Sequence, residues 1–139
     1  MIHTVKTKWI DNMQFESENP GGNLFIDAAE EFGGNNQGYS PKALMLSALA
    51  GCSGLDVVSL LRKMRVEVEK FSIDVEAHLT KEHPKYYDQV HLIYNFHGKG
   101  LKQDKIEKAV KMSKDKYCGV MEMFKKFAKV TAEIKYFEQ

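Results

Sequence analysis

The chain has 139 residues, of which 43% are hydrophobic and 28% are charged, and its formal net charge is +1. These values predict one globular domain spanning residues 1–139, and they give no electrostatic reason to expect binding to nucleic acid or to an acidic membrane. Two cysteines are too few for a disulfide-stabilised scaffold, and the N-terminal segment lacks the apolar core of a signal peptide. We therefore expect a reducing, cytoplasmic location.

Three short strands are predicted in the first third of the chain. Polar and apolar side chains alternate over residues 5–9, 13–17 and 23–27, which is typical of strands with one buried face. Asn, Pro and Gly separate these segments, so the pattern indicates an antiparallel meander. A glycine- and asparagine-rich loop follows over residues 30–39.

The most apolar stretch of the sequence is residues 43–61. Ser40 and Pro41 are a typical helix start, so we expect a helix from Pro41 to about Arg65. Its length is close to that of a membrane span, but Asp56 lies within it, and an acidic residue there costs about 2.5–3.5 kcal/mol on insertion. We therefore expect no membrane span, but a helix that is buried on nearly all sides.

Such a helix needs more cover than one small sheet can provide. A second copy of the chain would supply the missing apolar surface. The sequence therefore predicts an obligate homodimer.

The remaining elements are two long strands, two helices and a final strand. Apolar residues alternate with polar ones over residues 71–79 and 89–96, as expected for antiparallel strands covered on one side. Apolar residues recur at helical spacing over residues 106–113, a further helix is expected from Tyr117 or Cys118, and residues 130–136 alternate again. The predicted fold class is α+β, with antiparallel sheets and a long buried central helix.

The two cysteines are the main candidates for chemistry. A reactive thiol with a second thiol nearby is sufficient for reversible reaction with peroxide, whereas two buried structural cysteines fit the same composition. Lys114, Lys116 and a helix start all favour a thiolate at Cys118. Asp56 follows Cys52 by one helical turn and disfavours a thiolate there unless it pairs with a cation or orients polar groups.

The motifs around both cysteines resemble the OsmC/Ohr superfamily, the osmotically inducible and organic-hydroperoxide-resistance proteins. The first region contains G-Y-S-P, L-M-L-S-A-L-A-G-C and D-V-V-S-L-L-R-K-M-R within residues 38–65. The second is M-S-K-D-K-Y-C-G-V-M-E-M-F at residues 112–124. The order of elements and the length fit along the whole chain, and D-V-V after the first cysteine is similar to the OsmC-like branch.

The resemblance implies an intertwined homodimer with the paired cysteines near the subunit interface. It implies that Cys52 attacks the peroxide and that Cys118 resolves the product. It also implies organic hydroperoxides as substrates, a role in oxidative stress, and a dithiol reductant such as a lipoylated protein. No metal, haem or flavin cofactor is implied.

Two positions differ from the family pattern. Well-characterised members stabilise the thiolate with an arginine from the N-terminal strands, which a glutamate at the helix start holds in place. Here the only arginines are Arg62 and Arg65, and Lys42 stands at the glutamate position. We expect Lys42, Lys6 or Lys8 to supply the missing cation.

The histidines do not form a metal-binding motif. His78 and His91 lie on the polar sides of the two long strands, where they are expected to be neighbours across a hairpin. No pair has the i,i+4 spacing of helical metal ligands, and no His–Cys spacing fits a zinc site. We therefore expect no metal.

Two functions remain open from the sequence. The first is a thiol-dependent peroxidase built on Cys52 and Cys118, with Asp56 and Lys116 as further supporting residues. The second is a non-catalytic dimeric module that binds an apolar ligand in its interface cleft, which the missing arginine and glutamate favour.

Overall fold

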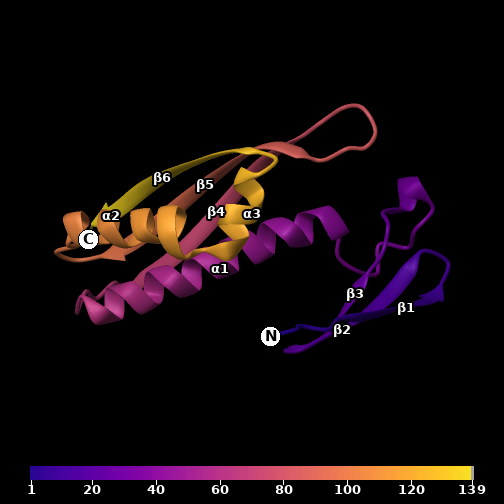
Figure 1. The fold of residues 1–139 in the computed structure, drawn as a ribbon, viewed down its shortest axis with the longest axis horizontal. Helices are drawn as coiled ribbons and strands as arrows, with labels where there is room; N and C mark the ends of the chain where they lie inside the picture. The colour runs from indigo at the N-terminus through magenta and orange to yellow at the C-terminus, as the bar shows by residue number, and fades with distance from the viewer. Residues whose placement is uncertain (139) are drawn as a thin grey trace. The chain divides into compact units, whose positions relative to one another are not determined.

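The N-terminal part of the chain forms a small sheet by itself. The structure is a computed structural model that describes residues 1–138, and the chain divides into two compact units, Met1–Met45 and Leu46–Gln139. The first unit has three antiparallel strands in the order β1-β2-β3, namely β1 (Lys6–Asp11), β2 (Gln14–Asn19) and β3 (Gly22–Ile26) (Figure 1). This confirms the predicted meander, while one domain over residues 1–139 stays a prediction.

A buried carboxylate organises the loop after β3. Asp27 is only 5% exposed, and it accepts hydrogen bonds from the backbone N–H groups of Ala28 at 2.7 Å and Gln37 at 3.0 Å. Bonds from N–H donors to a charged acceptor are strong. They close the loop, which contains the short helix η1 (Glu30–Phe32), immediately before the long helix.

The long helix α1 (Pro41–Lys63) begins at the predicted residue and ends at Lys63 rather than Arg65. Arg65 has a φ of 56°, in the left-handed region. The N–H of Val66 donates to the carbonyl of Leu61 at 2.9 Å. This pairing satisfies the last free carbonyls and terminates the helix.

Burial of α1 within the single chain is limited to one narrow stripe. The buried residues recur at every fourth position, at Leu49, Ser53, Val57 and Leu61, and so lie in line along one face. Leu55 is 76% exposed, and by length and composition the helix could also cross a membrane. Burial on all sides therefore stays a prediction that depends on a second subunit, and the absence of a span stays a prediction too.

The second unit contains a three-stranded sheet in the order β4-β5-β6, formed by β4 (Lys70–Leu79), β5 (Tyr87–Gly98) and β6 (Lys129–Glu138). β4 and β5 are antiparallel, as predicted. β5 and β6 are parallel, so the prediction of purely antiparallel sheets is wrong for this pair. The cause is the helical crossover between them, which returns the chain to the end of the sheet where β5 began.

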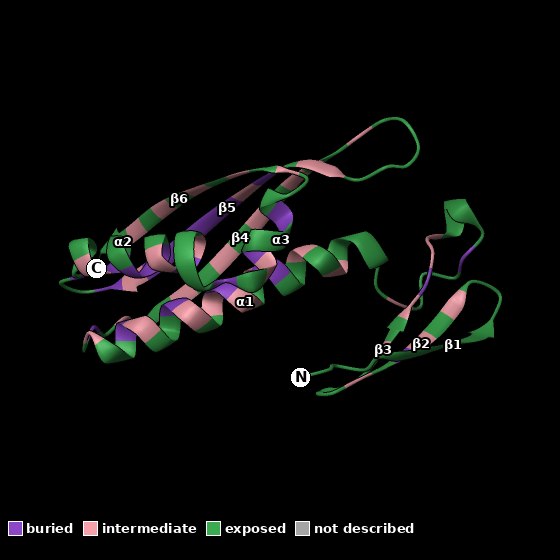
Figure 2. Ribbon diagram, viewed as in Figure 1, coloured by how far each residue is buried: buried purple, intermediate pink, exposed green. Residues whose placement is uncertain are grey.

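The crossover consists of α2 (Gln103–Met112), the π-helical turn η2 (Ser113–Tyr117) and α3 (Gly119–Lys125). These helices lie on the same face of the sheet as α1 from Leu46 onward (Figure 1). The central strand β5 is the most buried element (Figure 2), and its Tyr94 and Phe96 face the helices in the core. The active-site candidates lie in this layer between helices and sheet.

Candidate active site

The two cysteines come from α1 and from the start of α3. Cys52 is half-buried on α1 and packs against the core that contains Cys118. Cys118 is 5% exposed and caps α3, where its Sγ accepts a hydrogen bond from the N–H of Met121 at 3.3 Å. The capping position agrees with the predicted helix start near Tyr117 or Cys118.

The thiol of Cys118 is strongly biased toward its neutral form. Burial is the main cause and raises its pKa to about 11, and a hydrogen bond to the Cys52 thiol and negative charge on Cys52 and Asp56 act in the same direction. The Met121 N–H lowers this pKa but does not compensate. The prediction from local charge that Cys118 is the better thiolate is therefore wrong, because loss of water outweighs the nearby lysines.

A small pocket opens beside Cys118. Its volume is ≈ 240 Å³, and its lining includes Lys114, Lys116, Tyr117 and Glu122. The Lys116 ammonium lies 5.3 Å from the ring centroid of Tyr117. Of the predicted supporting residues, Lys116 thus borders the pocket at Cys118, where a positive charge can attract an anionic or polar reactant.

A buried chain of hydroxyl groups accompanies the cysteines. The hydroxyls of Tyr94 and Ser53 lie 2.7 Å apart, and those of Ser53 and Ser113 lie 2.9 Å apart. The Ser113 hydroxyl then donates to the Asp56 carboxylate at 3.1 Å. Asp56 therefore orients polar groups, which is one of the two roles open to it from the sequence.

The sequence alone did not indicate that these serines and this tyrosine lie beside the cysteines. The available signal was weak, because Tyr94 occupies an inward position of an otherwise apolar strand and a buried tyrosine hydroxyl needs a partner. Burial raises the pKa of Tyr94, the Ser53 hydrogen bond lowers it, and negative charge on Cys118 and Asp56 raises it further. The tyrosine hydroxyl is therefore electrostatically linked to the cysteine site.

The lysines proposed to replace the family arginine belong to the N-terminal unit. Lys42 and Lys6 are exposed, and Lys8 lies 3.5 Å from Glu16 on the neighbouring strand. Their support of Cys52 in the second unit stays a prediction.

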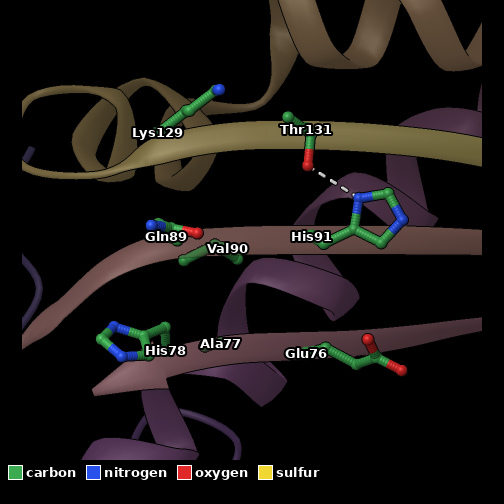
Figure 3. Close-up of a pocket in the computed structure, with 8 residues that line it drawn as sticks. All are labelled: Glu76, Ala77, His78, Gln89, Val90, His91, Lys129 and Thr131. Carbon is green, nitrogen blue, oxygen red and sulfur yellow. Dashed lines mark hydrogen bonds between the residues drawn. The ribbon is translucent and has the colours of Figure 1, made fainter.

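The histidines occupy the opposite, outer face of the second sheet. His91 is paired in register with Glu76, and His78 with Gln89, so the two rings are diagonal rather than directly opposed. They border a shallow pocket of ≈ 510 Å³, where His91 bonds to Thr131 at 2.7 Å (Figure 3). Over residues 1–138, no three His, Cys, Asp or Glu side chains are grouped to hold a metal ion.

The ionisation of Cys118 gives a direct labelling prediction. With a pKa of about 11, the thiolate fraction at about pH 8 is on the order of one in a thousand and rises about tenfold per pH unit. In the reduced, folded protein, iodoacetamide should therefore modify Cys52 first, and Cys118 only near pH 11 or after unfolding in urea. Peptide mass spectrometry measures both sites, and equal labelling near neutral pH would contradict this geometry.

Comparison with known proteins identifies relatives of this chain. The family model for OsmC-like proteins matches residues 34–133. Protein YhfA of Escherichia coli K12 is 29% identical over 127 residues, which cover 91% of this chain and 92% of YhfA. The crystal structure of a hypothetical protein from Aquifex aeolicus has a TM-score of 0.83 and 29% identity, with 99% of each chain covered.

A more distant structure shares the same fold. The organic hydroperoxide resistance protein OhrB of Bacillus subtilis has a TM-score of 0.69 and 18% identity, with 97% of this chain and 98% of OhrB covered. The family match extends over most of the chain and includes both cysteine motifs. The chain therefore belongs to the OsmC-like protein family.

Proposed function

We propose that this protein is a thiol-dependent peroxidase that reduces organic hydroperoxides through Cys52 and Cys118. The observation that carries the proposal is the packing of Cys52, half-buried on α1, against the core cluster that contains the buried Cys118 at the start of α3. Family relatives that include an organic hydroperoxide resistance protein support the substrate class.

The chemistry needs no cofactor. The Cys52 thiolate attacks the distal peroxide oxygen, the O–O bond breaks, and the alkoxide takes a proton to leave as an alcohol. Cys52 is then a sulfenic acid. The Cys118 sulfur attacks it, a disulfide forms, and the sulfenic hydroxyl leaves with the Cys118 proton as water. An external dithiol, such as a lipoylated protein in the cytoplasm, exchanges with the disulfide and restores both thiols.

A homodimer completes the proposal. Along α1 and β4, an apolar groove of ≈ 580 Å³ is lined by Gly51, Gly54, Leu55, Val58 and Phe71, among others. A side-chain carbon added at Gly51 would meet nothing within 4 Å, so the helix surface is open to a close partner. A second copy would bury this groove and give α1 its predicted cover.

Leu55→Glu is expected to dissociate that dimer, because it places a charge where the proposed interface is most apolar. Sedimentation velocity at low micromolar concentration measures the change. Gln103→Glu, at an exposed position on α2, also adds one negative charge and is the control that should stay dimeric. A folded monomer in the unmodified protein at this concentration would contradict the dimer.

Lysine support of the thiolate is the part of the proposed site that departs from the family pattern. A lysine is a hydrated point charge without the planar fork of arginine, so it should orient a peroxide less well. We expect low but measurable activity, and slower alkylation of Cys52 in Lys42→Ala or in the Lys6/Lys8 double substitution. Identical pH–rate profiles in all these proteins would exclude lysine support.

The alternative is a non-catalytic module whose apolar cleft binds a ligand, and the absent arginine and glutamate favour it. A consumption assay separates the two functions by comparing cumene hydroperoxide with hydrogen peroxide, and dihydrolipoamide with thioredoxin. The peroxidase should consume cumene hydroperoxide faster and prefer dihydrolipoamide. No consumption of either peroxide above the rate of a free thiol would favour the binding module.

A further inference from the structure

Ser113 joins three helical elements at the end of α2. Its N–H donates to the carbonyls of Ala109 and Val110 in α2. Its carbonyl accepts a hydrogen bond from the N–H of Cys118 at 2.9 Å, and this bond closes the π-helical turn η2. Its hydroxyl lies 2.9 Å from the hydroxyl of Ser53 on α1. One fully buried residue thus connects α1, α2 and the start of α3.

The same bonds connect the two cysteines by a short path. Ser53 directly follows Cys52 in the sequence, so the hydroxyl pair ties the backbone that carries Cys52 to Ser113. The Ser113 carbonyl in turn holds the N–H of Cys118. Two hydrogen bonds, each 2.9 Å long, therefore link the residue beside one cysteine to the backbone of the other. This link depends on contacts alone and not on the ionisation of either thiol.

The hydroxyl of Ser113 is held on α1 by more than one contact. Besides the Ser53 hydroxyl, it lies 3.4 Å from the Ser53 carbonyl oxygen and 3.1 Å from the Asp56 carboxylate. Ser113 is also the only buried residue of η2. Isolated π-helical turns occur frequently at functional sites. Its side chain is therefore the buried anchor that fixes this turn, and with it Cys118, against α1.

We propose that Ser113 is a positioning residue that holds the backbone of Cys118 in place for disulfide formation with Cys52. The catalytic meaning of this role rests on the proposed peroxidase function. There, the Cys118 sulfur attacks the Cys52 sulfenic acid, an S–S bond forms, the S–O bond breaks, and the hydroxyl leaves with the Cys118 proton as water. Holding two reacting groups in place raises their effective concentration. Ser113 therefore accelerates this second step and does not affect the attack of Cys52 on the peroxide.

The equilibrium between the reduced protein and the Cys52–Cys118 disulfide, measured in glutathione buffers, tests the proposal without hydroperoxide. Ser113→Ala removes the hydroxyl but keeps the carbonyl that holds Cys118. The equilibrium constant for disulfide formation should fall about fivefold, as for loss of one buried hydrogen bond, which is about 20 mV toward easier reduction. Ser17→Ala also removes a buried hydroxyl, which lies 3.0 Å from that of Thr7 in the N-terminal unit, and should leave the constant unchanged. Equal shifts in the two variants, or none in Ser113→Ala, overturn the proposal.

Ser53→Ala breaks the same bond from the side of α1 and serves if Ser113→Ala does not fold. It should lower the equilibrium constant in the same direction. The double variant should show less than the product of the two single effects, because both substitutions remove one shared bond. Fully multiplicative effects overturn the role of the bond between the two hydroxyls.

Single-turnover kinetics separate positioning from a general loss of structure. With one equivalent of cumene hydroperoxide, Ser113→Ala should consume the peroxide at the rate of the unmodified protein. It should form the disulfide about fivefold more slowly, so that dimedone traps more sulfenic acid at Cys52. Equal slowing of both steps overturns the positioning role. If the unmodified protein consumes no hydroperoxide, the proposed function fails, and the equilibrium in glutathione still decides the role of Ser113.

Discussion

Cys52→Ser is expected to reduce the consumption of organic hydroperoxide to the uncatalysed level, a loss on the order of 10³-fold or more, as for removal of other catalytic nucleophiles. The remaining thiol cannot replace it, because Cys118 is buried and its pKa is about 11. Stopped-flow or colorimetric measurement of cumene hydroperoxide with dihydrolipoamide gives the rate.

Cys118→Ser is the matched variant for this experiment. It should still reduce about one equivalent of hydroperoxide per chain, because the attacking thiol is intact, but form no intramolecular disulfide. Sustained turnover by Cys52→Ser, or equal effects of the two substitutions on the first equivalent, would contradict the assignment of roles.

Phe96→Ala is expected to destabilise the second unit by about 3–5 kcal/mol, the usual range for loss of a buried phenylalanine. Phe96 is fully buried on the central strand, and its ring stacks on Phe71 with centroids 4.5 Å apart and an interplanar angle of 6°. Its removal leaves a cavity between the sheet and the helices, in the layer that positions the cysteines. Urea unfolding followed by circular dichroism measures the change.

Phe137→Ala is the control for this effect. Phe137 is 42% exposed on the outer face of β6, where it stacks on His97. Its replacement should cost about 1 kcal/mol or less. A similar decrease in the free energy of unfolding in both variants would mean that packing between the sheet and the helices contributes less to stability than the structure indicates.

The order and type of the elements could be predicted from the sequence because each has a local signal. Alternating side chains mark the strands, and Ser40 with Pro41 marks the start of α1. Strand direction has no such signal, since alternation is the same in parallel and antiparallel strands. The parallel pairing of β5 with β6 follows from the crossover helices, and only the fold reveals it.

The site was predictable to a smaller extent. The motifs identified both cysteines, and the structure packs Cys52 against the core cluster that contains Cys118. Nearby lysines predicted a lowered pKa for Cys118, but its pKa is raised. The sequence could not show this, because burial depends on residues distant along the chain that pack over the thiol. The members of the hydroxyl chain come from α1, β5 and η2, so no spacing along the sequence indicates it.

Oxidation with a single equivalent of cumene hydroperoxide tests the central claim most directly. The reduced protein is mixed with the peroxide, quenched with a thiol-blocking reagent and analysed by intact and peptide mass spectrometry. The account predicts loss of two hydrogen atoms per chain and one disulfide joining the peptides that contain Cys52 and Cys118. Recovery of both cysteines carrying the blocking reagent, which marks thiols that were still free, together with unconsumed hydroperoxide, would contradict the account.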